Sequence, residues 1–571
     1  MFHESVQHVV AVALICLVFS VSIVISQFPE YAKFLPSPLV CISDGCIIGT
    51  TRNGLEGSQY EAFLGLPYAK PPLGKLRFRD TVPVEPWSGN YDGTYERSKC
   101  VQKNDARPHS QVEGSEDCLY LNLYRPKYTT DPLPVIFFIH GGRYASGSAS
   151  MAEYGPERLM DTRKVIVVVI QYRLGVFGFL STEDSNSPGN YGLKDQSMAL
   201  RWVQKNIKRF GGDTKRVMIV GHDAGAASVQ LHMMSPLSRG TFWKAVSMSG
   251  SALSYWNYNI DQERVARRQA AVLGIPEAYK ISTDKLVNEL RSVDAHELGR
   301  SIDRMKYFHV HPTGLYQPVA ERYVTNGTFL SKEPRALWVS GKYESVPWVT
   351  GFVPNDGAAD TLSIITNTTL LQQLNQNSRK FIPRLAGGDS NPRTVQMLKE
   401  RFFNESSQDR WLTKDNFFRL QNLVTESAII YPLALSVKQH VAKKNPRKAP
   451  VNVYYFNFKG RFSHSYLYSY TREDFGVCHS DELLYLFRNS AVATDFPNGS
   501  PEWIMAKGFV DYISKTAHEE TVGPTCERDD CQLLEFANSS NAKVPVELNL
   551  FNGFDEDLFQ FWRTFYRLQG I

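Results

Sequence analysis

The chain has 571 residues, of which 43% are hydrophobic and 21% are charged, the balance of a folded protein with ample material for a core. Its net charge of +5 is small and its basic residues are scattered, which excludes a nucleic-acid-binding surface built from clustered lysine and arginine. There is no internal repeat, low-complexity linker or composition break, so we expect one domain over residues 27–571.

The first 26 residues have the features of a secretory signal peptide. An apolar run extends from about Val9 to Ile25, and Val24 and Ser26 occupy the −3 and −1 positions of a cleavage site. No lysine or arginine precedes the run, and its length is close to the roughly 17 residues at which a helix begins to span a membrane. We expect a cleaved leader and a secreted, extracellular protein; the alternative is an uncleaved type II membrane anchor.

Cysteines and glycosylation sequons fit an oxidising, extracellular environment. Cys100 and Cys118 bracket a polar loop and are the best disulfide candidates, although spacing does not determine connectivity. Two further pairs could each close a small loop, Cys41 with Cys46 and Cys526 with Cys531, which leaves Cys478 over. Sequons for N-glycosylation stand at Asn326, Asn367, Asn404, Asn498 and Asn538.

Short apolar runs bounded by turn residues predict buried strands of a largely parallel sheet. Cys46–Gly49 reads as an early strand, Phe63–Ala69 as an extended approach, and Ala199–Ile207 as a helix that ends before Gly211. Two long helical segments, 261–335 and 371–438, are expected to cover the carboxyl ends of the strands, where α/β ligand sites lie. The alternation predicts a doubly wound α/β fold. Its strands are expected at Pro134–Ile139, Val165–Ile170, Val217–Val220, Ala245–Met248, Val346–Thr350, Val451–Phe458 and Val546–Leu550.

A tight strand-to-helix turn is predicted at residues 221–225, which read Gly-His-Asp-Ala-Gly. The spacing is that of the nucleophile elbow G-x-S-x-G, in which the central side chain is presented at the end of a strand. Gly221 and Gly225 stand where a side chain would collide with the neighbouring strand or helix. The central position, however, holds Asp223 in place of serine.

Several motifs together resemble the carboxylesterase/cholinesterase family (type-B carboxylesterases), and insect juvenile-hormone-esterase-like members in particular, from about Cys46 to Phe565. The resemblance implies an α/β-hydrolase fold, with a central, mostly parallel sheet flanked by helices. It also implies ester hydrolysis by a Ser-His-acid triad and an oxyanion hole, with no cofactor and no metal. The motifs are FLGLPYA at 63–69, EDCLYLN at 116–122, QYRLG at 171–175, FGGD at 210–213 and SPLSRG at 235–240.

The resemblance assigns each catalytic position to a residue of this chain. Asp223 takes the place of the serine nucleophile, and His479, within Gly476–Glu482, takes the place of the histidine. Asp356 stands where the family usually has glutamate, with a side chain one methylene shorter; the alternative is that Asp356-Gly357 is only a turn.

The oxyanion hole of the family comes from a glycine-rich loop and from the amide that follows the nucleophile. These positions are Gly141, Gly142, Arg143 and Ala224. Family members usually have glycine where Arg143 stands, so we expect its side chain to obstruct the acyl pocket and to restrict φ.

A carboxylate is a poor nucleophile toward an ester, and a buried one must be paired, protonated or hydrated. We expect Asp223 to pair with Arg143, with His479 or with both, which turns the catalytic centre into a structural ionic cluster. The hypothesis is a secreted, catalytically inactive protein with a degenerate triad, which acts in binding, adhesion or signalling through a protein partner or a small hydrophobic ligand.

Two enzymatic alternatives remain open at this stage. The elbow also resembles that of epoxide hydrolases, whose aspartate nucleophile attacks an sp³ carbon. The second alternative is that the protein retains weak carboxylic ester hydrolase activity. The family often dimerises through C-terminal helices, and the amphipathic pattern of Phe554–Leu568 permits a homodimer.

Overall fold

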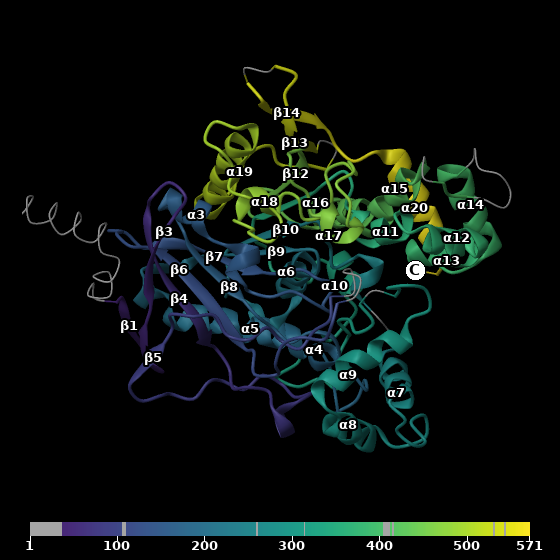
Figure 1. Ribbon diagram of the computed structural model, residues 1–571, viewed down its shortest axis with the longest axis horizontal. Helices are drawn as coiled ribbons and strands as arrows, with labels where there is room; N and C mark the ends of the chain where they lie inside the picture. Colours follow the sequence, from purple (N-terminus) through teal and green to yellow (C-terminus); the bar gives the residue numbers. More distant parts are fainter. Residues whose placement is uncertain are drawn as a thin grey trace, which may run out of the picture.

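A large mixed sheet runs through the protein (Figure 1) in this computed structural model. The structure describes residues 37–570 except 105–109, 259–260, 313, 404–410, 414–415, 529–530 and 542–543, so the expected leader and Asn404 lie outside the described residues. Within them the sheet has eleven strands in the order β14-β13-β12-β11-β10-β9-β7-β8-β6-β4-β3, and β1, β2 and β5 form a small second sheet.

The middle of the large sheet is parallel, as expected, from β8 through β7 and β9 to β13. Antiparallel strands flank it, β6, β4 and β3 at one end and β14 at the other. The strands are β1 Leu39–Ile42, β2 Gly45–Ile48, β3 Thr50–Asn53, β4 Gln59–Pro67, β5 Asn90–Asp92, β6 Tyr120–Pro126, β7 Leu133–Ile139, β8 Ile166–Ile170, β9 Gly212–His222, β10 Lys244–Met248, β11 Trp348–Phe352, β12 Val451–Asn457, β13 Gln532–Asn538 and β14 Val546–Asn552.

Alternate residues of the central strands supply two hydrophobic cores, one on each face of the sheet. In β7, Val135, Phe137 and Ile139 belong to one core, whereas Ile136 and Phe138 belong to the other. Because both faces are covered, the strand reads as a continuous apolar run rather than as an alternating one.

Helices cover the sheet, and the two expected helical segments contain only helices and loops in their described parts (Figure 1). The first carries α7–α10 and the second α12–α16. The helices are α2 Met151–Tyr154, α3 Glu157–Thr162, α4 Gly175–Phe179, α5 Tyr191–Asn206, α6 Ala224–Met234, α7 Gln262–Val272, α8 Thr283–Ser292, α9 Ala295–Ser301, α10 Pro334–Val339, α11 Ala358–Ile365, α12 Thr368–Gln376, α13 Ser378–Leu385, α14 Pro392–Phe402, α15 Phe418–Thr425, α16 Tyr431–Lys443, α17 Ser465–Ser469, α18 Leu483–Leu486, α19 Pro501–His518 and α20 Glu556–Leu568.

Several strands differ from the sequence-based expectation. The first five residues of the extended approach at Phe63–Ala69 form the end of the nine-residue strand β4, which stops at Pro67. Strands β6 and β13 were not expected. The segment Val546–Leu550 is a strand, but it is neither parallel nor buried: β14 is the antiparallel edge strand, and Leu548 and Leu550 are more than half exposed. Polar residues interrupt the apolar pattern of β6 and β13, which hides them from a periodicity test.

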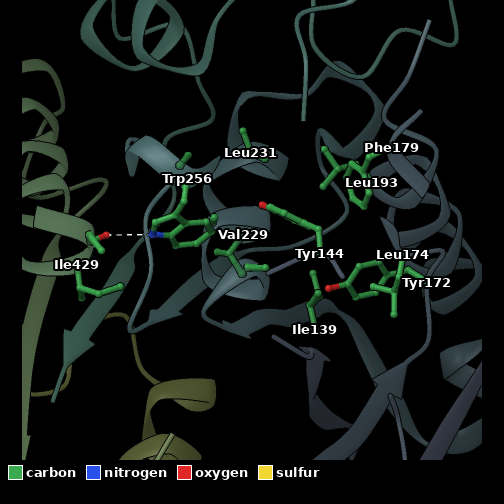
Figure 2. Close-up of a cluster of buried hydrophobic side chains, with 14 of the residues drawn as sticks. Ile139, Tyr144, Tyr172, Leu174, Phe179, Leu193, Val229, Leu231, Trp256 and Ile429 are labelled. Atoms are coloured by element: carbon green, nitrogen blue, oxygen red, sulfur yellow. Dashed lines mark hydrogen bonds between the residues drawn. The ribbon is translucent and has the colours of Figure 1, made fainter. Parts of the chain in front are cut away.

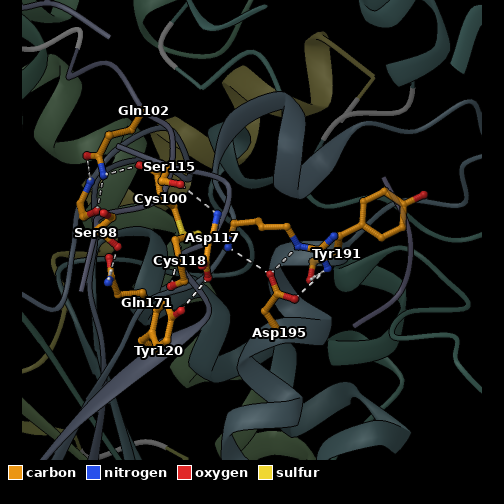
Figure 3. Close-up of a disulfide and its surroundings, with 12 residues drawn as sticks. Ser98, Cys100, Gln102, Ser115, Asp117, Cys118, Tyr120, Gln171, Tyr191 and Asp195 are labelled. Atoms are coloured by element: carbon orange, nitrogen blue, oxygen red, sulfur yellow. Dashed lines mark hydrogen bonds and ion pairs between the residues drawn. A yellow bond between two sulfur atoms is a disulfide. The ribbon is translucent and has the colours of Figure 1, made fainter. Parts of the chain in front are cut away.

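Three disulfides join the pairs that the sequence analysis considered, Cys41–Cys46, Cys100–Cys118 and Cys526–Cys531, while Cys478 is free and buried. Figure 3 shows the Cys100–Cys118 bridge near Asp195, whose carboxylate holds Arg173 at 2.7 Å. The asparagines of the four described sequons are exposed.

The C-terminal helix α20 has the expected amphipathic pattern, but its apolar face is used within the chain. Trp562 and Phe565 are fully buried, and α20 packs against α14 and α16. In the part of the chain that the structure describes, none of the helices combines the length and apolarity needed to cross a membrane.

Candidate active site

Asp223 sits at the turn between β9 and α6, in a backbone conformation that is rare for a residue with a side chain, with φ 52° and ψ −115°. The two glycines allow the turn. A Cβ on Gly221 would lie 2.2 Å from the carbonyl oxygen of Gly225, and one on Gly225 would lie 2.1 Å from that of Ile139. The elbow that the sequence predicts is therefore present in full, with a carboxylate at its apex.

The carboxylate of Asp223 accepts hydrogen bonds from the backbone amides of the loop that follows β7. Its Oδ2 accepts the backbone N–H of Gly142 at 2.9 Å and that of Arg143 at 2.8 Å. Gly141 approaches closely enough that an added Cβ would contact the Asp223 side chain at 3.0 Å. Two amides that the resemblance assigns to the oxyanion hole are thus bound to an anion of the protein itself. Ala224 is the buried first residue of α6.

The guanidinium of Arg143 turns inward and bridges two carboxylates. Its Nε lies 3.0 Å from Oδ1 of Asp223, and its terminal nitrogen lies 2.6 Å from Oδ2 of Asp360. The guanidinium also stacks 4.5 Å from the ring centroid of Trp256, and the indole of Trp256 donates to the carbonyl of Ala428 (Figure 2). The expected ion pair between Asp223 and Arg143 is therefore present, and Asp360 is a second partner that the sequence analysis did not identify.

The backbone at Arg143 is strained, as its side chain predicts. Arg143 has φ 52° and Tyr144 has φ 60°, a left-handed pair that costs on the order of 1–3 kcal/mol per residue without glycine. Packing holds the loop in place, because Tyr144 is fully buried and its ring lies near Trp256 (Figure 2). Its hydroxyl donates to Asn257 at 2.5 Å.

His479 and Asp356 form a close pair at the same site. The Nδ1 atom of His479 lies 2.7 Å from Oδ1 of Asp356, so the shorter side chain of aspartate does reach the imidazole. Burial lowers the pKa of His479, but the hydrogen bond and charge of Asp356 and the charge of Asp223 outweigh burial and raise it above 6.5. The imidazole is thus held with Nε2 free to face Asp223, whose Oδ1 is 4.0 Å away.

Asp223 stays ionised in spite of its burial. Burial raises the pKa of its carboxyl, but the charges of Arg143, His479 and His222 and the N–H of Arg143 lower it below 3.8. The side chain is only 3% exposed. A carboxylate held this way is stabilised as an anion, which reduces its tendency to share an electron pair with an electrophile.

Two further buried groups complete the cluster. Glu482 lies 3.5 Å from Nε2 of His222, and the His222 and His479 rings are 4.6 Å apart. The Ser249 hydroxyl lies 3.1 Å from Oδ2 of Asp356 and 3.2 Å from Oε1 of Glu482, so its single hydrogen is shared between the two carboxylates. Asp360 lies in the first turn of α11, where a carboxylate is common for helix stability alone, so no specific sequence signal pointed to its role in the cluster.

A cavity of about 180 Å³ opens beside the Asp223 carboxylate. It lies beyond the carboxyl ends of β7 and β9. Of the two segments expected to cover this edge, the first contributes Val310 and Gly314 to the lining and the second contributes none of its described residues. Leu467 and Tyr468 of α17 line the cavity instead. Its lining includes charged and polar side chains as well as apolar ones.

In this site a strand turns sharply into a helix, and the strained residue at the turn faces backbone amides from the loop after the adjacent strand. This arrangement defines the α/β-hydrolase class of protein. The comparisons with known proteins give the family. Residues 36–544 match the model of the carboxylesterase family, and the chain belongs to that family.

Among its relatives, the juvenile hormone esterase of Tribolium castaneum is 36% identical, over 86% of this chain and 85% of the relative. Venom carboxylesterase-6 of Apis mellifera is 31% identical, over 92% and 94%. The crystal structure of juvenile hormone esterase from Manduca sexta, with OTFP covalently attached, superposes with a TM-score of 0.78 at 26% identity and covers 93% of this chain and all of that one.

Proposed function

We propose that this carboxylesterase-family protein is catalytically inactive and acts outside the cell by binding, in adhesion or signalling. The observation that carries the proposal is the position of the Asp223 carboxylate, which accepts the N–H groups of Gly142 and Arg143. The relatives are named as esterases; the proposed loss concerns this chain and rests on its own residue at the elbow.

The electrostatics of ester hydrolysis support this proposal. An oxyanion hole accelerates acyl transfer because its donors are free to bind the charge that develops on the substrate oxygen. Here the donors already bind a full negative charge, and a substrate carbonyl would have to displace it. The carboxylate would also leave the guanidinium of Arg143, so displacement breaks a buried ion pair at a cost of several kcal/mol.

The framework around the site is kept. Ion pairs join Arg173 to Asp195 and Arg77 to Glu116, and three disulfides cross-link the chain. Disulfides and exposed sequons support an extracellular setting. A chain that retains its fold and surface while its nucleophile is replaced is suited to binding.

The His479–Asp356 pair favours a second candidate, an enzyme in which Asp223 attacks an sp³ carbon and His479 activates the hydrolytic water. Against it, both oxygens of Asp223 face cations or amides, which lowers their nucleophilicity.

Turnover assays separate the two. The purified full chain is assayed with p-nitrophenyl acetate and with styrene oxide, beside Asp223→Asn and beside the Tribolium castaneum juvenile hormone esterase as an active control. We expect wild type and Asp223→Asn to give the same background rate on both compounds. Turnover by wild type that Asp223→Asn abolishes overturns the proposal, and its appearance on the epoxide alone establishes the aspartate nucleophile.

A further inference from the structure

The cavity beside Asp223 carries an excess of negative charge, although the chain as a whole has a net charge of +5. Its described lining holds four carboxylates and two cations, and each cation lies between two carboxylates. Lys99 lies 3.6 Å from Glu113 and 3.7 Å from Glu153. Arg143 bridges Asp223 and Asp360. With neutral histidines the lining has a net charge of −2.

More negative charge lies directly behind the lining. Asp356 and Glu482 are almost completely buried, at 1% and 0% exposure. Burial raises the pKa of Glu482, but the charge and hydrogen bond of His222 and the charge of His479 lower it below 4.5. The charged side chains in and directly behind this part of the lining form one inner group. It contains four carboxylates, one guanidinium and two histidines: Asp223, Asp356, Asp360, Glu482, Arg143, His222 and His479. Even with both histidines protonated, the group keeps one uncompensated negative charge.

One buried acceptor in the lining lacks a donor. Oδ1 of Asp223 accepts no hydrogen bond from the described residues, since the N–H of Arg143, though only 3.0 Å distant at Nε, is not directed at it. Leaving a buried ionised oxygen without a donor costs free energy. A donor group that entered the cavity would recover that free energy.

We propose that this cavity binds a small organic cation, a primary or secondary ammonium compound whose N–H groups donate to Oδ1 of Asp223. The cavity, at about 180 Å³, holds several water molecules and therefore admits a small organic molecule. Tyr154 and Tyr468, which also line it, offer aromatic rings to a cation. The inference rests on the proposed function in one respect, that the cavity is kept for binding.

Three probes of similar shape and different charge test the proposal: benzylamine, benzyl alcohol and benzoate, titrated into the purified full chain at pH 7 in a calorimeter. We expect benzylamine to bind at least about tenfold more tightly than benzyl alcohol and benzoate to bind most weakly, because the field of the cavity favours positive charge. Equal or tighter binding of benzyl alcohol or benzoate, or no heat from benzylamine up to about 10 mM, overturns the proposal.

Variants locate the binding. Asp223→Asn removes the negative charge at the inner end of the cavity. Glu153→Gln removes a second negative charge at a side chain that is 23% exposed and tolerates substitution. We expect a loss of about tenfold in benzylamine affinity for Asp223→Asn and a smaller loss for Glu153→Gln. Asp511→Asn, on α19 and outside the cavity, is the matched control and should leave the affinity unchanged.

Benzylamine binding that both cavity variants leave unchanged overturns the proposal, since the amine would then bind elsewhere. Failure here differs from failure of the proposed function: absence of amine binding together with absence of turnover overturns only this inference, whereas turnover dependent on Asp223 overturns the proposed function whether or not the amine binds.

Discussion

Asp223 and Arg143 contact each other twice, through the backbone and through the side chain. The N–H of Arg143 donates to Oδ2 of Asp223 at 2.8 Å, and its guanidinium Nε lies 3.0 Å from Oδ1. The same arginine therefore supplies an oxyanion-loop amide and the countercharge for the anion that occupies it. This double contact explains how two departures from the family pattern are compatible with a well-packed site.

Removal of Arg143 should destabilise the protein severely. Arg143→Ala leaves Asp223 and Asp360 buried without their cation, and we expect the free energy of unfolding to fall by about 3–5 kcal/mol. Urea denaturation measures the loss. Lys515→Ala, which removes an exposed partner of Asp511, is the control and should leave the free energy of unfolding nearly unchanged, because solvent screens an exposed pair. A loss for Arg143→Ala as small as that of the control would contradict a structural role for the pair.

Esterase activity should need two changes, not one. Asp223→Ser introduces the hydroxyl, but Arg143 keeps its strained φ, and its guanidinium, still held by Asp360, stays beside the new nucleophile. We expect Asp223→Ser alone to remain at background and Asp223→Ser/Arg143→Gly to hydrolyse p-nitrophenyl acetate at least about 100-fold faster than the single variant, the scale of one oxyanion donor. Equal rates for the two variants would show that Arg143 does not obstruct the site.

The imidazole of His479 should make stability depend on pH near neutrality. Its pKa in the folded protein lies above 6.5, so its contribution is complete below pH 6.5 and is lost as the pH rises through the folded-state pKa. We therefore expect the difference in unfolding free energy between wild type and His479→Gln to shrink from pH 6 to pH 9. Urea denaturation at each pH gives this difference, in which the titration of other groups cancels. A difference that grows with pH would refute the assigned charge state.

The elbow should not tolerate a side chain at its second glycine. A Cβ at position 225 would meet the carbonyl oxygen of Ile139 at 2.1 Å, so Gly225→Ala should lower stability by about 1–3 kcal/mol. Gly508 is the matched control, because it lies exposed in the interior of α19 with open space around it. Gly508→Ala should raise stability by up to about 1 kcal/mol. Thermal unfolding of both variants tests the pair of expectations.

Much of the site could be predicted because local sequence carries it. The strand, the two glycines and the small residues of α6 identify the elbow without a structure, and they place Asp223 at its apex. The pairing of Asp223 with Arg143 also followed from charge, since a buried carboxylate requires a countercharge. Strands β6 and β13 were missed because polar residues interrupt their apolar pattern. They are strands because they form hydrogen bonds with neighbouring strands that lie far away in the sequence.

The sequence by itself determined the fold class, the elbow and the identity of the charged residues. The strand–helix alternation and the elbow could be predicted because each depends on residues close together in the chain. Only the tertiary structure decided where the Asp223 oxygens point. Their position depends on the loop after β7, on α11 and on the His479 loop, which converge from distant parts of the chain. For the same reason, only the structure shows that Asp360 shares Arg143 with Asp223 and that the cavity beside Asp223 has a net negative charge. Both features depend on side chains that the fold brings together from distant parts of the chain.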